Sequence, residues 1–144
     1  PVFHDPGQYT FQISKGELLR DGADVAILAN GLMVHEALDA ADALAETGIH
    51  ARVINLATIK PLDEEMVLQA ARDCGKIVTV EEHNVIGGLG EAVCACVAEH
   101  CPVPVKRIGV EDTFGHSGPA ADLLRQFGLC AEHIAQVTQA FAGK

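Results

Sequence analysis

The chain has 144 residues and lacks several features that define whole classes of protein. No apolar run approaches the roughly 18 residues that a membrane-spanning helix needs, so a transmembrane segment is excluded. The first residues, PVFHDPG, contain neither a basic region nor an apolar core, so they do not form a signal peptide. They also lack an initiator Met. This absence indicates a processed chain or, in the interpretation we prefer, a segment of a longer polypeptide.

Basic residues are scarce. The chain has 10 Lys and Arg residues against 20 Asp and Glu residues, which gives a net charge of −10. Nucleic acids and anionic membranes are bound through basic surfaces, so both are excluded as partners. No cluster of basic residues converges on a phosphate either. The segment alone is therefore a poor site for phosphorylated sugars.

The five cysteines are odd in number, and two of them stand in a C-x-C spacing that is too tight for an ordinary disulfide. This pattern predicts a reducing, cytoplasmic location. Cys94, Cys96, His100 and Cys101 also have the residue types of a zinc site. On a helix, however, residues 94 and 101 share one face while 96 and 100 share another. Buried thiols acting as small hydrophobic side chains are the favoured interpretation.

Apolar residues make up 49% of the chain, enough for one globular domain with a core. Residues 1–10, rich in Pro, Gly and polar groups, are predicted to be a linker or lead-in from a missing upstream domain. Phe11-Gln12-Ile13 alternates as a strand does, Gly16-Glu17-Leu18-Leu19-Arg20 follows, and Asp21-Gly22, a dipeptide typical of hairpins, makes a turn after this first strand region. We therefore expect an antiparallel edge strand, followed by a central strand over the apolar residues 25–29.

Strands and helices then alternate. Helices are predicted over 32–47 with a stop at Gly48, over 63–74 with Asp63 as cap, and over 90–100. Strands are predicted over 51–56, 77–80 and 103–110. Near the C-terminus we expect one helix from Pro119 to a stop at Gly128, with Leu123, Leu124 and Phe127 facing inward, and a separate terminal helix. This order indicates a parallel sheet with helices on both faces and one antiparallel edge strand.

The most informative stretch is VTVEEHNVIGGLGE, residues 78–91, which reads as the carboxyl end of a central strand turning into a helix. Ligands and partner surfaces usually meet an α/β sheet at that edge. Glu81, Glu82 and His83 could form an acid/base group, but consecutive strand residues alternate between faces and cannot all converge. A polar strand end that contacts another domain is the favoured alternative.

The glycines that follow also have two interpretations. Gly87, Gly88 and Gly90 precede a helix, where free N–H groups attract anions. The spacing matches neither of the common phosphate-binding motifs, so a tight turn with positive φ or close helix packing is favoured. His116, in a polar loop over 112–118, is expected at the same edge, where an ordinary loop histidine is the favoured interpretation.

Several segments resemble the C-terminal domain of the transketolase family, most closely the separate C-terminal subunit of a split transketolase. They are YTFQISKGELLRDG at 9–22, DVAILANGLMV at 24–34, ARVINLATIKPLD at 51–63, IVTVEEHNVIGGLG at 77–90 and VKRIGVEDTFGHSG at 105–118. GLCAEHI at 128–134 is similar to the family's Gly-Leu-Thr-x-x-x-Ile, with Cys130 in place of a capping Thr. A thiol caps poorly, so a looser helix start is expected there.

This resemblance implies a three-layer α/β/α domain over residues 11–144, with a five-stranded, mostly parallel sheet whose first strand is antiparallel. It implies a domain that supports a dimer in a transferase of the pentose phosphate pathway, one that moves a two-carbon ketol unit between sugar phosphates. Family members hold thiamine diphosphate and Mg²⁺ between pyrophosphate- and pyrimidine-binding domains or subunits, which would be this domain's partners. No motif of either site is present, so no catalytic, cofactor or metal residue is assigned to this segment. Its expected interface residues are Glu82, His83, Gly87, Gly88, Gly90 and His116.

Two related parents stay open at this point. The same domain type closes 1-deoxy-D-xylulose-5-phosphate synthase and the beta subunits of 2-oxo acid dehydrogenases, where it docks partners. A stand-alone anion-binding domain that uses residues 87–90 is a third hypothesis. The segment alone is expected to be inactive.

Overall fold

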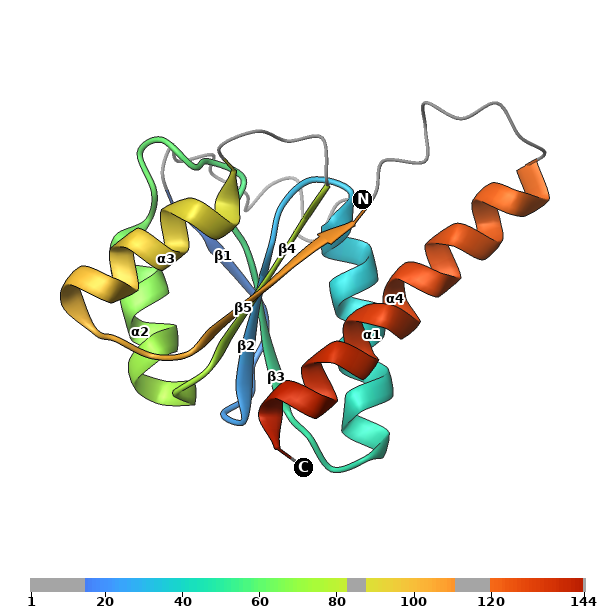
Figure 1. The fold of residues 1–144 in the computed structure, drawn as a ribbon, viewed down its shortest axis with the longest axis horizontal. Coiled ribbons are helices and arrows are strands. Elements are labelled where there is room, and N and C mark those ends of the chain that lie inside the picture. Colours follow the sequence, from blue (N-terminus) through green and yellow to red (C-terminus); the bar gives the residue numbers. More distant parts are fainter. Residues whose placement is uncertain (1–14, 83–87, 111–119, 144) are drawn as a thin grey trace, which may run out of the picture.

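The computed structural model describes residues 15–82, 88–110 and 120–143. Along these residues the elements are β1 (Glu17–Arg20), β2 (Val25–Ala29), α1 (Met33–Glu46), β3 (Ala51–Asn55), α2 (Glu64–Cys74), β4 (Ile77–Glu82), α3 (Leu89–His100), β5 (Val105–Val110) and α4 (Ala120–Ala142). The strands form one sheet in the order β1-β3-β2-β4-β5. Helices α1 and α4 cover one face and α2 and α3 the other (Figure 1), which confirms the predicted three-layer fold.

The first strand runs antiparallel at the edge of the sheet, as predicted, but it pairs with β3 and not with β2. Glu17 of β1 lies opposite Asn55 of β3. The hairpin predicted at Asp21-Gly22 is wrong because β3 and β4, both parallel to β2, occupy its two sides. The turn instead carries the chain past the amino end of β3, where Arg52 Nε donates a hydrogen bond to the Gly22 carbonyl at 3.2 Å.

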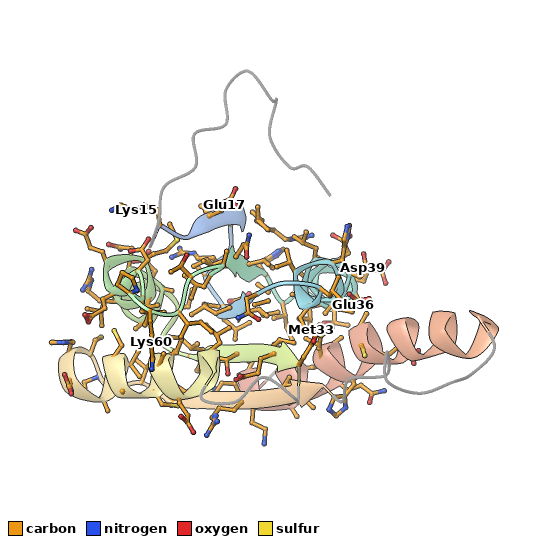
Figure 2. The ribbon with its side chains drawn as sticks, turned by 90° about the horizontal axis from the view of Figure 1, so that it is seen from above. Lys15, Glu17, Met33, Glu36, Asp39 and Lys60 are labelled. Atoms are coloured by element: carbon orange, nitrogen blue, oxygen red, sulfur yellow. The ribbon has the colours of Figure 1, made fainter. Side chains whose placement is uncertain are left out.

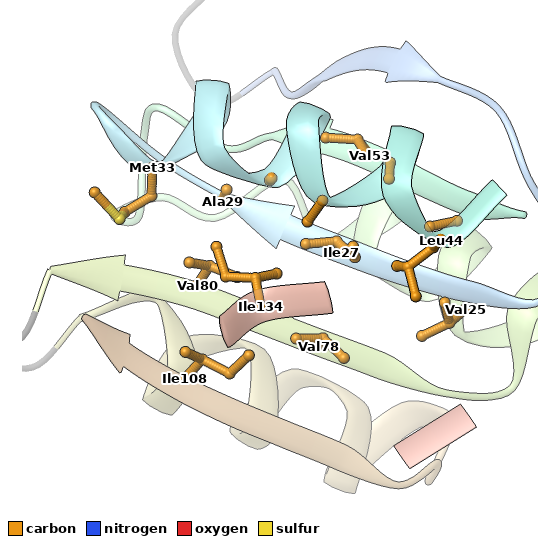
Figure 3. Packing of buried hydrophobic residues seen from close by; sticks show 14 of the residues in the cluster. Val25, Ile27, Ala29, Met33, Leu44, Val53, Val78, Val80, Ile108 and Ile134 are labelled. Atoms are coloured by element: carbon orange, nitrogen blue, oxygen red, sulfur yellow. The ribbon is translucent and has the colours of Figure 1, made fainter. Parts of the chain in front are cut away.

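Strand β2 is the centre of the core, because all five of its residues are buried and its alternate side chains serve both faces. Val25, Ile27 and Ala29 pack with α1 and α4, and Figure 3 shows Ile134 of α4 above Val78 and Val80 of β4 in that layer. The other face is built around Ala26, Leu28, Val67, Leu89 and Val93. Residues of β4 follow the same alternation, which decides where its terminal carboxylates point.

The ends of α1 and α2 agree with the predicted signals. Gly48, directly after the α1 C-cap, has φ +84°, and Gly75 at the end of α2 has φ +73°. Both are left-handed conformations that glycine adopts without a steric penalty. At the start of α2, Asp63 Oδ1 accepts a hydrogen bond from the Met66 amide at 3.2 Å. Its Oδ2 accepts one from the Gly16 amide at 2.8 Å, so this cap also holds the residue before β1.

The C-terminal region differs from the prediction, because α4 is one helix that continues through Gly128. A single glycine inside a helix costs about 1 kcal/mol, which the packing of α4 on α1 and the sheet outweighs. No helix starts at Cys130, so the expected loose cap is wrong; the residue lies half-buried against α1 and the sheet. The side chains of residues 120–129, including Leu123, Leu124 and Phe127, are outside the described ones.

No helix within the described residues combines the length and the apolar character needed to cross a membrane.

Candidate functional site

The carboxyl edge of the sheet has a topological switch point between β2 and β4. These neighbouring parallel strands continue into helices on opposite faces, β2 into α1 and β4 into α3. In open α/β sheets, ligands or partners bind at the edge where neighbouring strands lead to helices on opposite faces. Glu82, the last residue of β4, is half-buried at this point and pairs with Val110 of β5.

The described residues include three of the six predicted site residues. Besides Glu82 these are Gly88, the buried N-cap of α3 with φ −84°, and Gly90, buried in the first turn of that helix. His83, Gly87 and His116 lie outside the described residues. At Gly88 and Gly90 the structure shows no positive φ, so neither glycine serves a left-handed turn.

Glu81, the neighbour of Glu82, stabilises the start of α3 through a buried hydrogen bond. Its side chain is only 8% exposed, and its Oε2 accepts a hydrogen bond from the Gly90 amide at 2.7 Å. This amide belongs to the first turn of α3, where backbone N–H groups lack partners within the helix and a negative charge is favourable. The N-cap residue Gly88 has no side chain to fill that role. The carboxylate of Glu81 therefore caps α3 from the neighbouring strand.

Gly90 is required by close packing around this contact. A Cβ atom at residue 90 would lie 2.6 Å from Arg107 Nε, 2.8 Å from Glu81 Oε2 and 3.2 Å from Thr79 Oγ1. The first two distances are shorter than any ordinary contact to carbon, so a larger residue would displace the buried Glu81 carboxylate as well as the exposed Arg107 side chain. The last of the three glycines in this stretch thus lets α3 approach the sheet.

Thr79 and Arg107 also lie close to Gly90 at the start of α3, and the sequence alone did not indicate this. They lie opposite each other on the parallel strands β4 and β5, on the face that also carries Glu81. Thr79 is fully buried, and its Oγ1 has no hydrogen-bond partner within the described part of the chain. The alternation of side chains along β4 was readable from the sequence, but the register between β4 and β5 was not.

Three of the five cysteines have thiols that burial makes less reactive. Burial raises the pKa of the Cys74, Cys96 and Cys130 thiols, which keeps them protonated and weakly nucleophilic. Cys96 and Cys101 both pack in the apolar layer beneath α2 and α3. Among residues 15–82, 88–110 and 120–143 no three His, Cys, Asp or Glu side chains are grouped so that they could hold a metal ion.

One further ionisable group is buried near the same edge. Glu36, in the first turn of α1, is only 7% exposed, and desolvation raises the pKa of its carboxyl group, with the charge of Asp39 adding to the effect. Figure 2, seen from above, shows Glu36 and Asp39 on α1 at one side of the molecule, and Lys15 and Lys60 toward the opposite side. Carboxylates also lie near the two lysines, since Glu17 in β1 follows Lys15 and Glu64 and Glu65 open α2 after Lys60, so the carboxyl edge carries charges of both signs.

Comparison with known proteins gives consistent results. The family described as "Transketolase, C-terminal domain" matches residues 14–134. The 6-deoxy-6-sulfo-D-fructose transketolase subunit of Clostridium sp. (strain MSTE9) is 52% identical over 124 residues, 86% of this chain and 38% of that protein. The 1-deoxy-D-xylulose-5-phosphate synthase of Thermomicrobium roseum is 50% identical over 130 residues, 90% of this chain and 21% of that protein.

A solved structure described as a split gene transketolase, inactive beta4 tetramer, is similar over the whole fold. It has a TM-score of 0.83 and 44% identity, and the match covers 97% of this chain and 46% of that one. The chain thus spans less than half the length of each of these three proteins.

Proposed function

Because the chain belongs to the transketolase C-terminal domain family, we propose that it is the structural, dimer-supporting C-terminal domain of a thiamine diphosphate-dependent transketolase. The parent enzyme would transfer a two-carbon ketol unit between sugar phosphates, as in the pentose phosphate pathway, in the cytoplasm. The observation that carries the proposal is the 52% identity to a transketolase subunit over 86% of the chain. The free thiols support a reducing compartment.

The described residues do not fit the cofactor of such an enzyme. A diphosphate would favour free amides at the start of α3, but the Gly90 amide already binds the Glu81 carboxylate, whose charge would repel an anion. The described residues also offer no group of metal ligands. We therefore assign thiamine diphosphate and Mg²⁺ to the pyrophosphate- and pyrimidine-binding domains or subunits of the parent, and no catalytic residue to this segment.

Glu82, Gly88 and Gly90, with His83, Gly87 and His116 from outside the described residues, belong in this proposal to the surface that faces those domains. The assembly would be a homodimer or a complex of split subunits. The similar solved structure, a beta4 tetramer, is an example of association between subunits of that type.

The test compares two preparations. The full-length product that carries this segment, combined with any separate N-terminal subunit, should transfer ketol units between sugar phosphates when thiamine diphosphate and Mg²⁺ are supplied. The 144-residue chain alone should show no transfer and no heat of thiamine diphosphate binding in calorimetry. Tight binding of the cofactor to the chain alone would contradict the assignment.

The relationship to 1-deoxy-D-xylulose-5-phosphate synthase favours a second candidate, because identity to that enzyme is nearly as high, at 50%. The same full-length preparation separates the two. Formation of 1-deoxy-D-xylulose 5-phosphate without ketol transfer between sugar phosphates would replace the transketolase proposal with this one.

A further inference from the structure

The direction of β1 determines where the preceding polypeptide reaches the domain. Because β1 is antiparallel to β3, its first residue, Glu17, lies beside Asn55 at the carboxyl edge of the parallel strands. A parallel β1 would have started at the opposite edge. A polypeptide that precedes residue 15 is therefore connected to the domain at the edge that carries Glu82 and the switch point.

The point of entry is also held tightly. The Gly16 amide donates a 2.8 Å hydrogen bond to Asp63 Oδ2, and Asp63 is itself fixed as the cap of α2. A Cβ atom at residue 16 would lie 2.7 Å from Met66 Sδ and 2.8 Å from Leu56 Cδ2. The described chain thus begins in close contact with α2 and the end of β3, so a preceding polypeptide joins the domain at this edge.

The same edge has unusual surface chemistry for this protein. Leu18 and Leu32 are the large apolar side chains of the described residues that are exposed, at 50% and 52%. Leu32 lies directly before α1 at the carboxyl end of β2, and Leu18 is the second residue of β1. Lys15 and Lys60 are exposed at this edge, in a chain whose net charge is −10. Exposed apolar side chains beside charged groups, here Lys15 and Lys60 with Glu64 and Glu65, are features of a surface that meets a partner.

The opposite edge of the sheet is closed by contacts within the chain. Arg52 Nη1 donates to Asp73 Oδ2 at 2.9 Å, and the His50 amide donates to Asp24 Oδ2 at 2.7 Å. Lys76 Nζ donates to the carbonyl oxygens of Phe141 and Ala142, at 3.1 and 3.3 Å, and holds the end of α4. These contacts tie β2, β3, α2 and α4 to one another at the edge opposite the entry of the chain.

We infer that the carboxyl edge, through Lys15, Leu18, Leu32 and Lys60, is the docking surface for the domain that precedes this segment in its parent protein. The inference rests on the proposed function, in which a C-terminal domain follows the rest of the enzyme. The surface of that preceding domain should be apolar, with carboxylates opposite Lys15 and Lys60. The shallow groove that Lys106, Val137, Ala140 and Phe141 line between β5 and α4 is the competing surface.

Lysine acetylation tests the inference without any substitution. The full-length product and the 144-residue chain are acetylated under the same conditions, and the rate at each lysine is read by mass spectrometry. Lys15 and Lys60 should react several-fold more slowly in the full-length product, while Lys106, exposed on β5, should react at the same rate in both. Unchanged rates at Lys15 and Lys60, or protection of Lys106 alone, would overturn the inference.

A pair of matched substitutions gives a second readout. Leu32→Asp and Ala140→Asp each place a carboxylate at an exposed apolar position, the first at the carboxyl edge and the second at the groove. In the full-length product, Leu32→Asp should speed proteolysis between the domains and separate their thermal transitions, and Ala140→Asp should not. Equal effects, or a larger effect of Ala140→Asp, would contradict docking at the carboxyl edge.

This experiment and the activity assay can fail separately. Ketol transfer by a full-length product whose Lys15 and Lys60 stay reactive would leave the proposed function intact and reject the docking surface. Slow acetylation of Lys15 and Lys60 in a product that carries out another reaction would support the docking surface and reject the proposed function.

Discussion

Replacement of Glu81 by Ala should destabilise the isolated chain more than any other single change at the carboxyl end of β4. The carboxylate accepts a hydrogen bond from the buried Gly90 amide at 2.7 Å and lies at the positive end of α3. Alanine leaves that N–H group buried without its partner. Glutamine keeps an acceptor of the same shape and removes only the charge.

The two effects can be assigned approximate magnitudes. An unsatisfied buried N–H group costs about 1–3 kcal/mol, and a charge at a helix terminus contributes about 0.3–1 kcal/mol. Glu81→Ala removes both effects and should therefore lower the free energy of unfolding by about 1–4 kcal/mol, whereas Glu81→Gln should lower it by about 0.3–1 kcal/mol. For a domain of this length, a loss in the middle of the first range, about 2–3 kcal/mol, corresponds to a fall in Tm of about 6–10 °C.

Urea unfolding monitored by circular dichroism measures these losses, because the chain has no Trp to serve as a fluorescent probe. Glu82→Ala is the matched control: the residue is adjacent, but its side chain points to the other face and is half-buried. We expect it to change stability by less than about 0.5 kcal/mol. If Glu81→Ala costs no more than Glu82→Ala, the capping role of Glu81 is refuted.

Three further substitutions test other parts of the structure. Burial raises the pKa of Glu36 above its ordinary 4.5, so the folded chain binds this proton more tightly than the unfolded chain and loses stability as pH rises through the raised pKa. Glu36→Gln should therefore stabilise the chain at pH 8 and less so at pH 5 in thermal melts, while Asp39→Asn, on the exposed face of α1, should not follow this trend. Gly22→Ala places a Cβ atom 2.5 Å from the His50 carbonyl oxygen and should cost more than about 2 kcal/mol in urea unfolding, exceeding Gly31→Ala, where φ is +58° but the space is open. Asp63→Ala removes two acceptor contacts and should cost about 1–2 kcal/mol; a loss no larger than that of Glu65→Ala in the same helix would contradict the cap.

Local signals in the sequence were enough to predict most elements. The exposed face of α1, with His35, Asp39, Asp42 and Glu46, follows directly from the helical period. Asp63 and Gly75 fix the two ends of α2 through a side-chain cap and a left-handed residue. These features depend on neighbours in sequence, and the physical chemistry that produces them acts within one turn of helix.

The errors have a common physical origin in contacts between distant parts of the chain. The Asp21-Gly22 turn is compatible with a hairpin, and only the parallel partners on both sides of β2 exclude it. Gly128 would end a helix whose continuation had nothing to pack against, but α4 packs on α1. The cap that Glu81 provides needs the approach of α3 to β4, which no local pattern specifies.

The short β1 strand limits where a chain boundary can be placed without exposing the edge of the sheet. Its four residues occupy the outer side of β3, whose backbone donors and acceptors would otherwise be open. Of the described residues in the two apolar layers, a chain cut between β1 and β2 would lose Leu19 alone, yet it would present β3 as a bare strand edge. Such edges recruit strands from other molecules and lead to aggregation. A gene fission or an engineered boundary that preserves solubility must therefore fall before Gly16, on the far side of its contact with Asp63.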